Sequence, residues 1–184
     1  MQGHIQTLDA PLHNKLINRQ FVIHHHLRFP VDINWGEDLC MSFLCQIYST
    51  RIAYLPKTLY HLRMYSSSYT GCADREKYLQ LIKCPQFLEA ELQKTALSSS
   101  YSLQLLQMKF EVKEYLLIEP SLRDIAYWRT LYPECHSIIW KSGVYFPLYL
   151  RVIAWLAANQ LIIAAEILLR LRDHISHYRY AKTS

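Results

Sequence analysis

The sequence predicts a helix-rich α/β fold, on three observations. Only 4 glycines and 7 prolines interrupt the 184 residues, and 51% of the residues are hydrophobic, which is enough for one sizeable core. Two segments, 52–55 and 59–65, are rich in tyrosine and aliphatic residues, as strands are. Long helical patterns begin at Asp74. We therefore expect mixed structure over residues 1–72 and a helical extension over residues 73–184.

The first part of the chain has one well-marked helix start. Gly36 precedes two acidic residues, which favour the positive end of a helix dipole, and apolar residues then recur at near-helical spacing. A short element is expected around residues 14–18, ahead of this helix. The two strand-like segments follow it and are separated by Pro56.

Helical patterns occupy most of the remaining chain. We expect helices over residues 74–97, 101–117, 122–132 and 148–175. Three consecutive serines and Pro120 separate the first three of these helices. The last segment is the most apolar, but polar residues interrupt it before the roughly 20 apolar residues of a membrane span are reached.

The last predicted helix is amphipathic. On a helical wheel its polar residues fall within one arc of about 100°. These residues are Arg151, Asn159, Glu166, Arg170 and Asp173. Its apolar face, which includes Trp155, either packs on the preceding helices or lies in a membrane interface, and packing is the preferred interpretation.

Charge and cysteine content exclude several classes of protein. The formal net charge is +5, and no basic stripe indicates nucleic-acid binding. The five cysteines include no C-x-x-C pair, so we expect reduced, mostly buried thiols in a cytosolic setting. The first residues contain no continuous apolar stretch of a secretory signal. We therefore expect a cytoplasmic protein, with peripheral contact to the inner face of the cell membrane as a further expectation.

Adjacent carboxylates at Glu37 and Asp38 form the sharpest candidate site. Acidic residues in the first turn of a helix are routine capping and dipole partners, which is the simpler interpretation. The functional interpretation is a carboxylate that stays ionised at a helix amino terminus and accepts a proton from an attacking hydroxyl. The position of these residues in the sequence leaves both interpretations open.

The histidines give weaker signals. His61 lies in a strand-like segment, where an ordinary half-buried histidine is favoured over a ligand for metal or phosphate. His24, His25 and His26 are consecutive, so on a helix their side chains point in different directions and do not chelate one ion together. A solvated helix end is the preferred interpretation of that run.

Several short sequence words resemble the later part of bacterial family 2 glycosyltransferases. Each word is unspecific, but their order and spacing over about sixty residues form a moderately strong signal. The words are Asn14-Lys15-Leu16, Arg28-Phe29-Pro30, Gly36-Glu37-Asp38, Leu59-Tyr60-His61-Leu62-Arg63 and Ser68-Tyr69-Thr70.

The resemblance implies the carboxy-terminal half of a GT-A fold and an inverting transfer from a nucleotide-diphosphate sugar. It implies that Asp38 is the general base and that Glu37 orients the acceptor or caps the helix. Lys15 and Arg63 are the cations that could face the departing diphosphate, whose developing charge needs positive partners, although a surface or structural role is the preferred interpretation of each. The implied partners are a nucleotide sugar and a glycan or lipid-linked acceptor, in the synthesis of surface polysaccharide.

The sequence departs from this family in one major respect. A complete member begins with a nucleotide-binding half and a D-x-D motif for a divalent metal, Mg or Mn, and the aspartates of this chain never form D-x-D. No ligands for such a metal are found in the sequence. We therefore expect a fragment of a longer enzyme, inactive as this chain alone, although a remnant of a broken gene and a stand-alone module also fit.

A non-catalytic binding or scaffold protein is the competing class. In that interpretation Asp38 is only a cap, and the helical half offers its surface to a partner. An incomplete sheet would expose an edge and an apolar face, so we also expect self-association.

Overall fold

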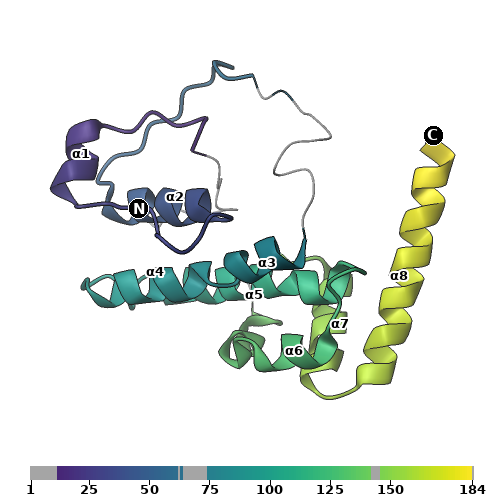
Figure 1. Cartoon of the computed structure of the whole chain (residues 1–184). Helices are drawn as coiled ribbons and strands as arrows, with labels where there is room; N and C mark the ends of the chain where they lie inside the picture. Colours follow the sequence, from purple (N-terminus) through teal and green to yellow (C-terminus); the bar gives the residue numbers. More distant parts are fainter. Residues whose placement is uncertain (1–11, 62, 64–73, 142–145, 184) are drawn as a thin grey trace. The chain divides into compact units, whose positions relative to one another are not determined.

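The computed structural model describes residues 12–61, 63, 74–141 and 146–183 (Figure 1). The chain forms two compact units, Met1–Leu105 and Leu106–Ser184, which we call unit 1 and unit 2. The boundary between them falls within helix α5 (Ser102–Ile118). The division after residue 72 that the sequence suggested stays a prediction.

The helix-rich character is confirmed, but the predicted α/β class is wrong. Within the described ranges every regular element is a helix, and no strand is present. The half of a GT-A fold that the resemblance implied contains a sheet, so the described structure gives that fold no support.

The predicted strands at 52–55 and 59–65 account for this error. Residues 51–61 form neither helix nor strand, and their side chains are exposed, with Ile52 70% and Tyr54 89% accessible. Lys57 N donates to Leu55 O at 2.8 Å, which closes a tight turn around Pro56. Strand propensity is not sufficient without a neighbouring strand to pair with, and this segment has none in the described part of the chain. Residues 62, 64 and 65 lie outside the described residues.

Local sequence signals determine where the first two helices of unit 1 begin. Helix α1 (Arg19–His24) begins after Asn18, whose side chain accepts a hydrogen bond from Gln20 N at 2.8 Å. The element expected around residues 14–18 therefore lies a few residues later. Helix α2 (Glu37–Tyr48) begins where the sequence predicted, directly after Gly36.

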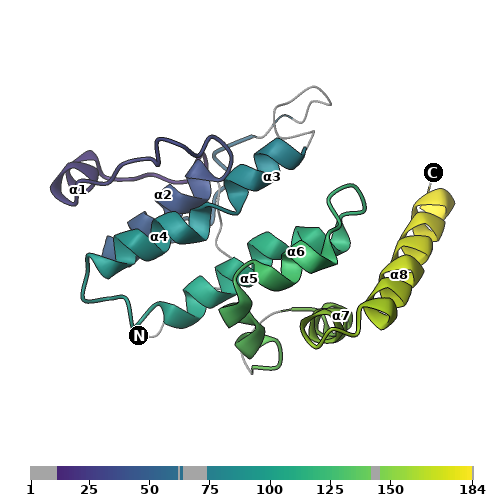
Figure 2. The same cartoon turned by 60° about the horizontal axis from the view of Figure 1, so that its bottom comes forward.

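The single helix expected over residues 74–97 is two helices. Helix α3 (Arg75–Leu81) is capped by the side chain of Asp74, and α4 (Cys84–Gln93) follows after two residues. Pro85 lies in the first turn of α4, where its missing N–H costs nothing, whereas it would break a continuous helix. Helices α2 and α4 pack side by side (Figures 1 and 2). The core of unit 1 includes Cys40, Phe43, Leu44, Tyr78, Cys84, Leu88 and Leu92.

Unit 2 contains most of α5, from Leu106 onward, and the predicted range of this helix is confirmed within one residue at each end. Helix α6 (Ile125–Thr130) is capped by Asp124 and ends shortly before Pro133, which opens the short 3-10 helix η2 (Pro133–Ile138). The core includes Met108, Phe110, Val112, Leu116, Leu117, Trp128, Ile138, Ile139, Leu150, Ile153 and Leu169.

The long final helix expected over residues 148–175 is also two helices, α7 (Leu148–Ala158) and α8 (Ile162–Thr183), which pack on each other (Figure 2). Gln160 adopts a left-handed conformation with φ of 65°, and Asn159 Nδ2 donates to Trp155 O at 2.8 Å. Both features are typical of a helix end. The polar residues that one continuous helix would have placed in a single arc therefore belong to two helices.

Packing within unit 2, the preferred interpretation of the apolar face, is confirmed for α7. Leu150, Ile153, Ala154 and Ala157 are buried, whereas Trp155 is 41% exposed. In the part of the chain that the structure describes, no helix combines the length and the apolar character needed to cross a bilayer.

Candidate functional site

The start of α2 is held by a close approach of the backbone to the junction of α3 and α4. Gly36 has a φ of 99°, and a Cβ atom built there would lie 2.6 Å from Cys84 Sγ and 3.0 Å from Leu81 Cδ1. The Cys84 thiol lies 3.5 Å from Gly36 O. Glycine therefore satisfies both the left-handed backbone and the narrow space at the position directly before Glu37.

Replacing Gly36 with alanine is expected to lower the free energy of unfolding by about 1–3 kcal/mol, because a Cβ in the left-handed region is strained and meets the Cys84 sulfur. Urea unfolding followed by circular dichroism measures this loss. The Cys84→Ala background separates the two causes, because the clash contribution should disappear there and the backbone contribution should remain. An unchanged unfolding midpoint for Gly36→Ala would contradict the assignment.

Glu37 and Asp38 occupy the first turn of α2, as the sequence predicted, and both are half-buried. At this end of the helix the dipole stabilises negative charge. Asp38 Oδ2 accepts a hydrogen bond from Leu12 N at 3.5 Å, which is at the long limit for such a bond. The carboxylate is thus oriented by the chain that precedes α1, but only weakly, so that another donor can replace that contact.

Two of the sequence words that carry the family resemblance contact the residues directly before a third word. Leu12 contacts α2 through its hydrogen bond to Asp38. The His13 ring stacks on the ring of Tyr60, with centroids 4.4 Å apart and an angle of 30° between the planes. Leu12 and His13, which directly precede the first word, therefore link the Glu37-Asp38 pair to Tyr60. We call this group the Asp38 site.

The two predicted cations have different surroundings. Lys15 is half-buried, and its Nζ donates to Asn14 Oδ1 at 3.0 Å. Its charge also opposes the effect of burial, which raises the pKa of the Cys45 thiol on α2. Arg63 is exposed. The structure thus brings Lys15 close to α2, on the same stretch of chain that contacts Asp38.

The histidine predictions have mixed outcomes. His24 is the last residue of α1, His25 caps it and His26 has a φ of 52°, so the run is a helix end, as predicted. His61 is exposed in an irregular segment, so the expected half-buried strand histidine is wrong. Among the described residues no group of three or more His, Cys, Asp or Glu side chains can hold a metal ion. The resemblance implies that the divalent metal belongs to the donor-binding half, so it stays a prediction, and we derive no step through it.

Unit 2 contains a buried polar group that the sequence did not reveal. We call it the Lys113 cluster; it comprises Lys109, Lys113, Trp128, Glu134, Cys135 and His136. Lys113 is completely buried, and its Nζ lies 2.6 Å from Leu131 O and 2.8 Å from His136 Nε2. The same Nζ lies 4.1 Å from the centre of the Trp128 ring. Lys109 pairs with Glu134 at 2.7 Å.

Burial is the main cause of the altered pKa values in the Lys113 cluster. It lowers the pKa of Lys113 to about 8 and raises the pKa of Cys135 to about 11. Burial and the neighbouring Lys113 charge lower the pKa of His136 to about 4. At neutral pH His136 is therefore an uncharged acceptor for Lys113. A fully buried amine whose protons are bonded to these partners stabilises the fold and offers no access to a substrate.

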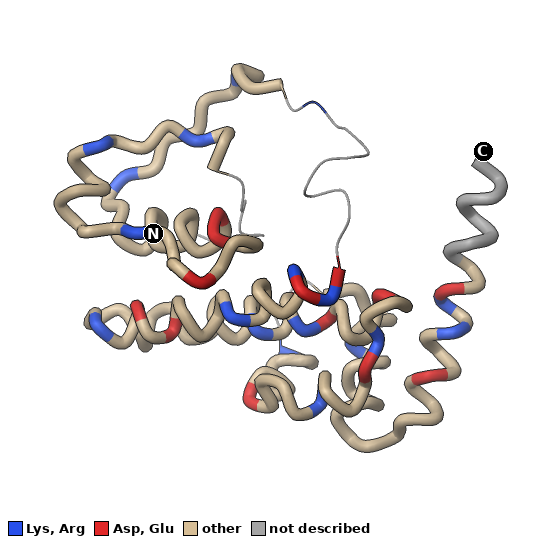
Figure 3. The backbone as a smooth tube through the Cα atoms, viewed as in Figure 1, with Lys and Arg blue, Asp and Glu red and all other residues tan. Residues whose placement is uncertain are grey.

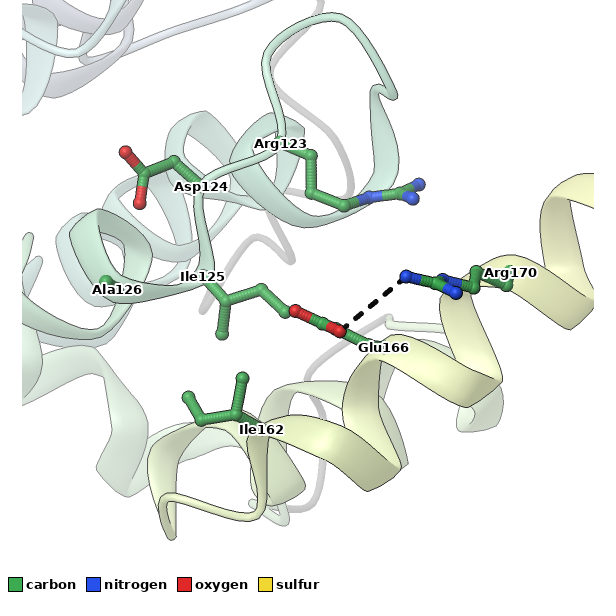
Figure 4. Close-up of a pocket in the computed structure, with 7 residues that line it drawn as sticks. All are labelled: Arg123, Asp124, Ile125, Ala126, Ile162, Glu166 and Arg170. Atoms are coloured by element: carbon green, nitrogen blue, oxygen red, sulfur yellow. Dashed lines mark ion pairs between the residues drawn. The ribbon is translucent and has the colours of Figure 1, made fainter.

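A cavity of about 420 Å³ lies between α6 and α8 in unit 2 (Figure 4). Its lining includes the charged residues Arg123, Asp124, Glu166 and Arg170, and Ile125 and Ile162 face each other across it. Arg123 pairs with Asp173 at 2.7 Å and also donates to Leu117 O at 2.9 Å. Because these bonds occupy Arg123, the cavity contains no set of polar groups converging on one ligand.

Comparisons of the chain with protein-family models, curated proteins and solved structures give no significant match. The resemblance to family 2 glycosyltransferases therefore rests on the sequence words alone.

Proposed function

We propose that unit 1 forms the acceptor side of an inverting glycosyltransferase, with Asp38 as the general base. One observation carries the proposal. The words Gly36-Glu37-Asp38 and Leu59-Tyr60 are far apart in sequence, but both contact the two residues directly before Asn14: Leu12 N donates to Asp38, and His13 stacks on Tyr60. A group of residues that acts on one substrate has to be brought together in this way.

The proposed reaction requires one correctly positioned carboxylate from this part of the chain. Asp38 would accept the proton of an acceptor hydroxyl while that oxygen attacks the anomeric carbon and the nucleotide diphosphate leaves. Such a base has to be ionised and within about 3 Å of the hydroxyl. The helix amino terminus favours the charge, and the long contact to Leu12 N can yield to a closer acceptor hydroxyl.

The remaining residues of the Asp38 site have supporting roles in this proposal. Glu37 would orient the acceptor, and Lys15 and Arg63 would stabilise charge on the departing diphosphate. The nucleotide sugar itself would be bound by a separate donor-binding part, joined to this chain or supplied by a partner. The acceptor would be a glycan or lipid-linked glycan in surface polysaccharide synthesis.

Changing Asp38 to asparagine is expected to reduce sugar transfer by about 100-fold or more, because general-base catalysis contributes factors of this size. The assay follows transfer from labelled nucleotide sugars in the protein isolated from its own cells together with its donor-binding part. Asp32→Asn is the matched control, because Asp32 is an exposed acid of the loop before α2. Full transfer activity in the Asp38→Asn protein would show that Asp38 is not the base.

A further inference from the structure

Helix α8 exposes a row of large aliphatic side chains on one face. Ile163 is 77% exposed, and Ile167, Leu171 and Ile175 are each 54% exposed. The four residues follow one another at intervals of four, so they form a continuous row along the helix, which we call the α8 ridge. Monomeric proteins rarely leave such a row in contact with water without using it.

The opposite face of α8 is firmly attached to unit 2. Ala165 and Leu169 are completely buried. Arg172 Nη1 donates to Ile118 O at 2.6 Å, and Asp173 pairs with Arg123 at 2.7 Å. The exposure of the α8 ridge therefore belongs to a helix that is already docked by its other face.

The α8 ridge has the geometry to pack against the same ridge of a second copy of the chain. Residues four apart form the rows that interdigitate in the commonest class of helix packing, in which the two helix axes cross at about −50°. A second copy of the chain presents the same row. Around a two-fold axis, Ile163 would lie opposite Ile175 of the second copy and Ile167 opposite Leu171, and both pairs are centred on position 169.

In the same two-fold arrangement, opposite charges along the edge of the ridge face each other between the two copies. Glu166 and Arg170 lie at this edge, 4.0 Å apart, and the Glu166 and Arg170 side chains are 48% and 80% exposed (Figure 4). Their midpoint is position 168, one residue from the centre of the ridge, which corresponds to about 1.5 Å of helix rise. One two-fold axis therefore serves both the aliphatic pairs and two Glu166–Arg170 ion pairs between the copies.

The balance of charge favours a second copy over a lipid surface. Both signs of charge lie along the described part of α8, with Glu166 and Asp173 acidic and Arg170 and Arg172 basic (Figure 3). Helices that bind anionic membranes concentrate lysine and arginine on their polar face, which this edge does not do.

We propose that α8 is a homodimer interface, in which the α8 ridges of two copies pack antiparallel and Glu166 of each copy pairs with Arg170 of the other. Four partly exposed aliphatic side chains cover less than the roughly 800 Å² per partner of a standard stable interface. The dimer therefore dissociates on dilution. This proposal is independent of the catalytic role of Asp38.

Sedimentation equilibrium of the full chain over a range of concentrations tests the interface. The mass is expected to rise from 21.8 kDa towards twice that value as the concentration increases. Ile167→Glu should raise the dimer dissociation constant at least about tenfold, as the loss of a central contact does. Ile23→Glu, a change of the same residue type at 49% exposure in α1, should leave it unchanged. Circular dichroism checks that both variants remain folded.

A charge swap tests the pairing of the two copies. Glu166→Arg and Arg170→Glu should each weaken the dimer, and the double variant should restore it, because opposite charges face each other again. A chain that stays monomeric at all concentrations, or a dimer that Ile167→Glu leaves intact, overturns the proposal. A monomer that cosediments with anionic phospholipid vesicles through Ile167 also overturns it, and would make the α8 ridge a membrane surface.

Discussion

Replacing Trp128 with alanine is expected to lower the free energy of unfolding by about 3–5 kcal/mol, the range for deleting a large buried aromatic side chain. Trp128 is completely buried and contacts the Phe110 ring edge to face, with centroids 6.2 Å apart. It also stacks on His136 at 4.9 Å and faces the Lys113 ammonium. The deletion therefore leaves a cavity and removes a favourable partner of a buried charge.

Urea unfolding of the full chain, followed by circular dichroism, measures this effect. Trp140→Ala is the matched control, because Trp140 also belongs to unit 2 but is 52% exposed. We expect the control to lose less than about 1 kcal/mol, as surface substitutions do. Equal losses in the two variants would show that Trp128 does not form the centre of the core of unit 2.

Acidification is expected to destabilise unit 2 between about pH 6.5 and pH 4. Burial and the Lys113 charge lower the pKa of His136 to about 4, below its ordinary value of 6.5. As the pH falls through 6.5, the unfolded chain takes up a proton on this histidine while the folded chain does not. Stability is therefore lost over this interval, by up to about 3 kcal/mol, since one pKa unit corresponds to about 1.4 kcal/mol.

Thermal unfolding at a series of pH values tests the role of His136. His136→Gln keeps an acceptor for Lys113 and does not titrate, so its unfolding temperature should fall less steeply over the same interval. Other acid-sensitive groups, such as Glu134 paired with Lys109, act equally in both proteins. Identical pH profiles would show that His136 protonation does not limit the acid stability.

The sequence predicted helices well where local chemistry determines them. The start of α2 follows from Gly36 and the two acids after it, and the range of α5 follows from the three serines before it and Pro120 after it. Helix interruptions were harder to predict. The single helix expected over residues 74–97 took no account of Pro85, which would break it, and Gln160 carries no signal for a left-handed conformation, which depends on how α7 packs on α8.

Features that depend on distant parts of the chain were predicted poorly. The segments at 52–55 and 59–65 have the composition of strands, but a strand also needs a partner for its backbone groups. For the Asp38 site, the sequence predicted the position of the carboxylate in α2 but not the His13–Tyr60 stack that joins two of its segments. Lys113 was missed because lysines are almost always surface residues, and only the fold shows that this one is buried.

The buried thiols give each unit its own chemical reporter of opening. Cys40 and Cys84 are completely buried in unit 1, and Cys135 is completely buried in unit 2. A thiol-modifying reagent reaches such a sulfur only when the surrounding structure opens, so its rate of reaction measures that opening. Labelling followed by mass mapping can therefore rank the local stabilities of the two units in the unaltered protein.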